Sequence, residues 1–164
     1  DGYDTTDVGP ITVTFSNQPI PVGDVCTAPT VIAMSGTMTN QTTLGFGNDY
    51  DLDASATSCT GFEAPGLDRV YQVTVPTGMT LTATVTPVGA GAMDDLAIYF
   101  VDSPAASCTT TISTCLAGKD DGVEAEPETA TYLNASGATK TIFVVVDSFD
   151  PAAPNAFDLA VQVQ

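Results

Sequence analysis

Residues 69–86 read RVYQVTVPTGMTLTATVT, and this stretch decides the fold class. Apolar side chains occupy every second position up to Val75 and again from Leu81 onward, with glutamine and threonine between them. Successive side chains of a β-strand point to opposite faces, so each half predicts a strand with one apolar face. Pro76 and Gly78 separate the two halves and are typical of a turn. The stretch therefore predicts two strands that each contribute one face to a core.

The same two-residue period recurs at Leu96–Phe100 and Phe157–Val163. Residues Ile142–Val146 are apolar throughout, which predicts a central strand covered on both faces. Val31–Met38 and Thr129–Leu133 are weaker strand candidates. Turn residues separate these segments, and no helical period persists, so we expect an all-β fold. The spacing favours an antiparallel β-sandwich of about eight or nine strands.

The charge of the chain excludes several classes of function. Its 164 residues carry 20 acidic and 3 basic side chains, a net charge of −17, and no histidine. Such a chain repels nucleic acid and anionic membranes, so we expect neither as a partner. Without histidine, the usual general base and the commonest zinc ligand are missing, and we expect no enzyme. No apolar run reaches the roughly 18 residues of a membrane span, and no leader precedes the chain, so we expect a processed, secreted protein.

Four cysteines are present, and no two of them form a Cys-x-x-Cys pair. Two disulfides are therefore favoured over a zinc site, which implies an oxidising compartment. Three pairings are possible. We favour Cys108–Cys115, which closes a short loop rich in serine and threonine, and this choice leaves Cys26–Cys59 as the second pair.

Two acidic segments are candidate ligand sites. Asn48, Asp49, Asp51 and Asp53 alternate within one loop, and Ca²⁺ is bound by such carboxylate and amide oxygens. The alternative is a solvated acidic loop whose side chains cap turns. The other segment, 120–128, lacks calcium-loop spacing and is expected to be a solvated charged loop.

Several motifs together resemble the bacterial pre-peptidase C-terminal domain family, across roughly residues 24–164. The most specific is Gly66-x-Asp68-x-x-Tyr71 leading into a strand that ends Val-Pro-x-Gly. The segments 95–99 and 144–148 and the Cys108/Cys115 pair add to the likeness. The resemblance implies a jelly-roll-like β-sandwich without catalytic activity, carried on secreted bacterial proteins.

The resemblance also implies ligands. Some members bind calcium, and the likeness places Asn48, Asp49 and Asp68 near the position of that ion. Other members bind collagen or polysaccharide, so extracellular matrix or polysaccharide is a possible partner. The acidic residues that calcium-binding members carry further upstream have no counterpart in residues 41–46.

Residues 1–23 differ from the rest and have no counterpart in the family pattern. Within them Ile11, Val13 and Phe15 alternate with polar residues, and Ile20 lies between two prolines. Such an arm predicts a donor strand that inserts into the sheet of a neighbouring copy. Two alternatives stay open: a strand that folds back onto its own sandwich, and a linker from a preceding domain.

The first functional expectation is therefore a structural subunit of an extracellular bacterial fibre or surface layer, polymerising through its N-terminal arm with identical subunits. The alternative is a calcium-binding accessory or adhesive module of a secreted bacterial protein. A hydrolase using paired carboxylates is the weakest reading, because nothing in the sequence selects the pair.

Overall fold

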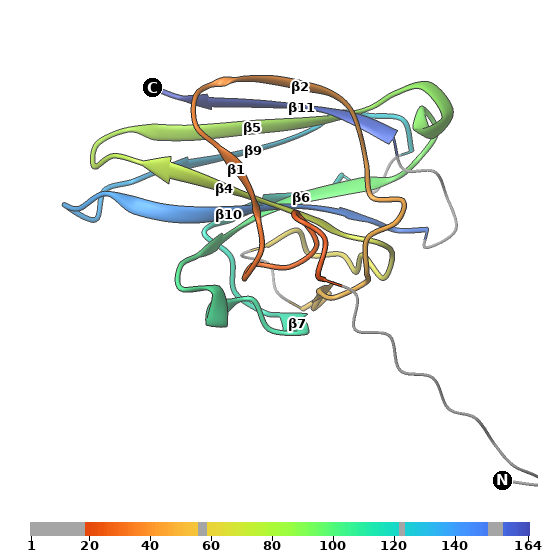
Figure 1. Cartoon of the computed structure of the whole chain (residues 1–164), viewed down its shortest axis with the longest axis horizontal. Helices are drawn as coiled ribbons and strands as arrows, with labels where there is room; N and C mark the ends of the chain where they lie inside the picture. Colours follow the sequence, from red (N-terminus) through yellow and green to blue (C-terminus); the bar gives the residue numbers. More distant parts are fainter. Residues whose placement is uncertain (1–18, 56–58, 122–123, 151–155) are drawn as a thin grey trace, which may run out of the picture.

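The structure is a computed structural model that describes residues 19–55, 59–121, 124–150 and 156–164. Two facing sheets contain nine strands, with five in the first sheet and four in the second (Figure 1). The first sheet has the order β1 (Thr30–Ile32), β4 (Arg69–Val75), β10 (Lys140–Ser148), β6 (Leu96–Asp102) and β8 (Ala117–Lys119). The second has the order β2 (Gly36–Thr42), β11 (Ala156–Val163), β5 (Thr80–Pro87) and β9 (Glu128–Leu133). The expected all-β sandwich is confirmed.

Smaller elements complete the described part of the chain. The strands β3 (Asp51–Leu52) and β7 (Thr111–Ile112) form a separate parallel pair. Two short 3₁₀ helices, η1 (Gly89–Gly91) and η2 (Ala105–Ser107), lie in connections. No helix among the described residues has the length and apolar character needed to cross a bilayer.

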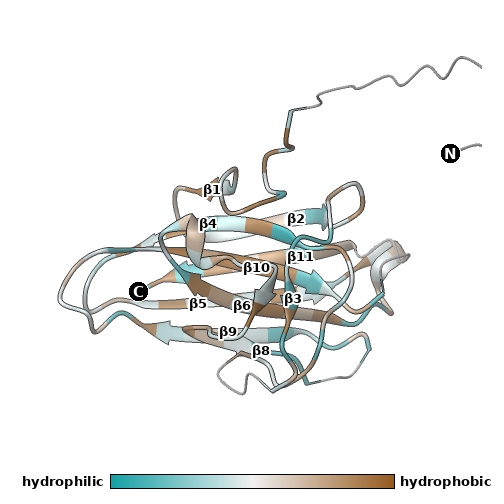
Figure 2. Ribbon diagram, turned by 90° about the horizontal axis from the view of Figure 1, so that it is seen from below, coloured by the Kyte–Doolittle hydropathy of each residue, from teal (hydrophilic) through white to brown (hydrophobic). Residues whose placement is uncertain are grey.

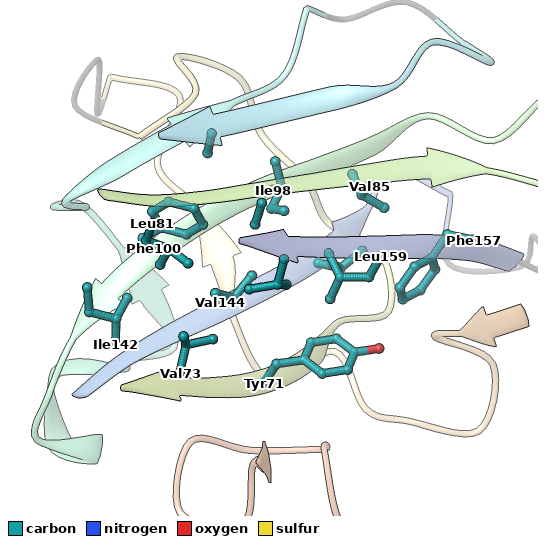
Figure 3. Close-up of a cluster of buried hydrophobic side chains, with 14 of the residues drawn as sticks. Tyr71, Val73, Leu81, Val85, Ile98, Phe100, Ile142, Val144, Phe157 and Leu159 are labelled. Atoms are coloured by element: carbon teal, nitrogen blue, oxygen red, sulfur yellow. The ribbon is translucent and has the colours of Figure 1, made fainter. Parts of the chain in front are cut away.

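The core between the sheets follows from the two-residue period. Burial alternates strictly along β5, where the apolar residues are buried and all four threonines are only partly buried. Leu81 and Val85 from this strand meet Leu159 from β11 and, from the facing sheet, Tyr71 and Phe100 (Figure 3). These side chains are fully buried. The alternation that predicted the strands is therefore the pattern that fills the core.

The strand β10 is central and covered on both faces, as its continuous apolar sequence predicted. It is the middle strand of the first sheet, between β4 and β6. Ile142 and Val144 face the core between the sheets. Phe143 and Val145 belong to a second apolar cluster on the outer face, which includes β3, β7 and both disulfides. Brown segments in the middle of the sandwich mark this apolar content (Figure 2).

The candidate strand Val31–Met38 is not one strand. It divides into β1 and β2, which belong to different sheets, and Ala33–Ser35 crosses between them. Moreover, β1 runs parallel to β4, whereas an antiparallel sandwich was expected. The chain enters β1 in the direction of β4 and leaves it at once for the other sheet, so only three residues pair.

The expected disulfide pairing is wrong, although all four cysteines do form two disulfides. Cys26 bonds Cys108 and Cys59 bonds Cys115, with Cα atoms 6.3 and 4.9 Å apart. The segment between Cys108 and Cys115 contains β7, which pairs with β3 instead of folding into a closed loop. Each cysteine therefore meets a partner that lies far away in the sequence.

Candidate functional site

The buried carboxylate of Asp68 is the centre of the candidate site. Asp68 immediately precedes β4 and is fully buried. Its Oδ2 accepts hydrogen bonds from the backbone N–H groups of Asp49 and Tyr50, at 2.8 and 2.9 Å. Its Oδ1 is also buried but has no hydrogen-bond partner among the described residues. A buried oxygen without a donor is costly, so this atom marks a position where a ligand would be stabilising.

Gly47 brings two further carboxylates to this position. Its N–H donates to Oδ1 of Asp24 at 2.7 Å, and its carbonyl accepts from the N–H of Asp68 at 3.0 Å. A Cβ atom at Gly47 would lie 2.5 Å from Oδ2 of Asp49 and 3.5 Å from Oδ1 of Asp24. A larger residue at position 47 would therefore have to displace the Asp49 carboxylate. We call Asp24, Asp49 and Asp68 the Asp68 cluster.

The loop that carries Gly47 is held in place by the only arginine of the chain. Arg69, the first residue of β4, donates from its guanidinium to the carbonyl of Thr42 at 3.2 Å. The same guanidinium lies 4.7 Å from the centre of the Phe46 ring, within cation–π range. These contacts fix both ends of residues 42–46 against β4, so Gly47 and Asp49 are positioned beside Asp68.

The charges of Asp24 and Asp49 disfavour the ionisation of Asp68. Burial raises the pKa of Asp68 to about 7, and the charges of Asp49 and Asp24 add to this effect. The two backbone hydrogen bonds lower the pKa but do not offset the burial. Burial and the charge of Asp24 also raise the pKa of Asp49. A cation bound here would favour the ionised forms of Asp49 and Asp68.

A second buried carboxylate, that of Asp147, interacts electrostatically with Asp68. Asp147, near the end of β10, is fully buried and accepts a hydrogen bond from the Tyr99 hydroxyl at 3.1 Å. Burial raises the pKa of Asp147 well above its usual value, and the charge of Asp68 raises it further. Asp147 has donors for both oxygens, the second being the N–H of Ser148. It is therefore a satisfied structural acid, unlike Asp68.

The structure separates the residues that the sequence proposed as one metal site. Asp49 and Asp68 lie together, but Asn48 directs its amide Nδ2 to Oδ1 of Asp51 at 3.2 Å and to a backbone carbonyl. Asp53 is partly exposed and accepts hydrogen bonds from Ser55, as a turn-capping residue does. In this loop the side chain of Asp49 therefore joins the Asp68 cluster, whereas Asn48 contacts Asp51 and Asp53 contacts Ser55.

Sequence reasoning missed Asp24. It lies 23 residues before Gly47, and the hydrogen bond between them depends on tertiary contact alone. The only sequence signal near it is the Val22-Gly23 break, which carries no information about a partner loop.

The second acidic segment is only partly a solvated loop. Glu128 begins β9, is 2% exposed, and accepts a hydrogen bond from the N–H of Asp121 at 2.7 Å. Burial is the main cause that raises its pKa. Lys119 pairs with the exposed carboxylate of Asp121. We find no side chain of this segment in the Asp68 cluster.

The donor set of the Asp68 cluster suits a hard cation. Carboxylate and backbone carbonyl oxygens are the ligands that Ca²⁺ takes, so carboxylates need not supply the whole shell. No group of three or more acidic, cysteine or histidine side chains within the described ranges is arranged to hold a metal ion. Within the cluster, the atom left open to a ligand is Oδ1 of Asp68, which has no hydrogen-bond partner among the described residues.

Most of the predicted assembly residues lie outside the described residues: Ile11, Val13 and Phe15. Ile20 is described and is 57% exposed. Comparison with known proteins adds no assignment, since no protein-family model and no curated protein matches the chain.

Proposed function

We propose that this chain is a structural subunit of an extracellular fibre or surface layer, and that its N-terminal arm joins it to an identical neighbour. The observation that carries the proposal is the completeness of the sandwich without the arm. Strands between Thr30 and Val163 supply both faces of the core. We therefore propose that a second copy buries the alternating apolar residues Ile11, Val13 and Phe15.

Burial of the apolar residues of the arm would stabilise such a contact. Burial of three large apolar side chains contributes roughly 1.5–3 kcal/mol each before the cost of ordering the arm. An inserted strand adds backbone hydrogen bonds, and alternate side chains fix its register. A head-to-tail contact of this kind does not close on itself and so generates a filament.

The disulfides and the net charge of the chain also favour an extracellular role. Two disulfides indicate an oxidising environment, and we propose that the chain is secreted. A net charge of −17 keeps individual subunits apart in solution. Assembly then depends on a specific contact instead of general surface attraction.

The test is deletion of residues 1–18. We expect a folded monomer that forms no filaments by negative-stain microscopy and sedimentation, whereas the full chain forms them. Two matched variants change alternate positions of the arm. Replacing Ile11, Val13 and Phe15 with serine should abolish assembly. Replacing Thr12 and Thr14 with serine should not. Filaments from the truncated chain would refute the proposal.

The free oxygen of Asp68 favours a second candidate function, a calcium-binding accessory or adhesive module. This role is also what the resemblance to pre-peptidase C-terminal domains implies. Calcium should raise the melting temperature of the full chain, and Asp68→Asn should remove that increase. An adhesive module should in addition bind collagen or polysaccharide, and retention of the chain on neither surface would count against adhesion.

A further inference from the structure

A groove is open at the edge of the sandwich beside β1. Here Ala33–Ser35 cross from the first sheet to the second, and the crossing segment leads from β1 to β2 (Figure 1). The groove, of about 360 Å³, lies along this crossing, between the ends of β4 and β11. It is lined by the crossing segment on one side and by Met79 and Val163 on the other.

The groove is an exposed extension of the core. Ile32, Met79 and Val163 line it and also pack against the main apolar cluster. At its rim Val31 is 65% exposed and Met34 is 79% exposed. Large apolar side chains that are grouped and exposed typically mark a contact surface.

A strand edge is also open at this place. The strand β4 has seven residues, but β1 pairs only with Tyr71, Gln72 and Val73. Within the part of the chain that the structure describes, no strand pairs with this edge of β4 beyond Val73. An extended segment entering the groove would therefore meet both apolar side chains and an edge for strand addition.

Apolar lining and the absence of charge together distinguish this groove from other hollows of the surface. None of its lining residues is charged. Two hollows near β3 instead contain carboxylates, among them Asp95, Asp120 and Asp51. One other hollow, beside β2 and β11, is uncharged but is lined mainly by serine, threonine, glycine and glutamine. The arm is itself acidic, with Asp1, Asp4 and Asp7 and no basic residue. An acidic segment is repelled from the carboxylate-lined hollows and not from this groove.

We propose that this groove receives Ile11, Val13 and Phe15 from the arm of a second copy, an inference that rests on the proposed function. The described start of the arm supports insertion into a neighbour. Ile20 and Val22 are 57% and 67% exposed. Residues 19–22 lead away from both sheets (Figure 2). Eighteen residues precede them, enough for about 60 Å of extended chain.

Disulfide trapping between two full-length variants tests the proposal. Every cysteine among the described residues is already paired, so added cysteines supply the reacting thiols. Val13→Cys and Met34→Cys are made in separate chains and mixed under mild oxidation. We expect a cross-linked heterodimer with Met34→Cys and none with Met93→Cys, since Met93 is also exposed, at 68%, but does not line the groove.

A chain carrying both Val13→Cys and Met34→Cys shows whether the arm in a groove comes from the same chain or from a second copy. Cross-linking within one chain, independent of concentration, would show that the arm occupies its own groove and would overturn the proposal. Cross-linking between chains that increases with concentration supports it.

A second variant, Met34→Asp, separates this proposal from the proposed function. Met34 is exposed, so the substitution leaves the fold intact, but a carboxylate in the groove must be buried when the arm binds. We expect the concentration needed for assembly to rise about ten-fold or more. If the wild type assembles and Met34→Asp assembles equally well, the groove assignment is wrong and the fibre proposal stands. If the wild type does not assemble at all, the proposed function itself fails.

Discussion

Replacing Asp68 with asparagine should reduce the pH dependence of stability. In the folded chain the pKa of Asp68 is raised to about 7, mainly by burial. An unfolded aspartate has a pKa near 3.9, so the folded state binds the proton more tightly. The stability associated with this proton is fully present below pH ~4 and is lost as the pH rises through 7. The protein should therefore be less stable at pH 8 than at pH 4.5.

The size of the effect follows from the difference between the two pKa values. A difference of roughly 3 corresponds to about 4 kcal/mol of unfolding free energy. For a chain of this length, that is about 8–16 °C in melting temperature. In the wild type, Oδ2 of Asp68 accepts hydrogen bonds from the N–H groups of Asp49 and Tyr50. Asparagine at position 68 still offers an oxygen to these two donors. The variant therefore keeps these contacts but cannot ionise.

Thermal unfolding in EDTA at several values between pH 4.5 and 8, followed by circular dichroism, measures the effect. The fall in melting temperature should be much smaller in Asp68→Asn than in the wild type. Some dependence should persist, because burial also raises the pKa of Asp147 and Glu128. The control is Asp53→Asn: hydrogen bonds from Ser55 lower the pKa of Asp53, so this group stays ionised throughout the range. Equal slopes for wild type and Asp68→Asn would refute the reasoning.

Three further substitutions test the fold around the site. Gly66→Ala should prevent the native approach of β4 to β10, because a Cβ there would lie 2.2 Å from a backbone carbonyl of β10; soluble expression and melting temperature check this. Replacing Cys26 and Cys108 together by serine should cost about 4.5 kcal/mol in urea unfolding, given their separation of 82 residues. A change below about 1 kcal/mol would contradict this loop estimate. Tyr99→Phe should lower the free energy of unfolding by about 1–3 kcal/mol, since one buried oxygen of Asp147 loses its donor. A variant as stable as the wild type would show that this hydrogen bond contributes nothing to stability.

The sequence predicted the fold class because strand patterning is local. Each strand buries every second side chain, so alternation in residues 69–86 is visible without knowing the partner strand. The strand β10 was recognisable for the same reason, since a strand covered on both faces needs apolar residues at every position. Motif glycines were also visible, although only the structure shows that Gly66 is required by its contact with β10.

The candidate site was only partly predictable. Asp49 was selected from its acidic loop and from a resemblance, and Asp68 from the resemblance alone; the structure places the two together. It also adds Asp24 and moves Asn48 toward Asp51. Side-chain direction within an irregular loop depends on the neighbours it meets, and residue spacing does not contain that information.

The sequence by itself determined an acidic all-β sandwich with two disulfides and an apolar stripe in its N-terminal arm. Tertiary structure decided which cysteines pair, where β1 leaves one sheet for the other, and that one oxygen of the buried Asp68 carboxylate is left without a donor. The division has one physical cause. Alternation and charge are properties of neighbouring residues, whereas pairing and burial depend on segments far apart in the sequence that meet only when the sheets close.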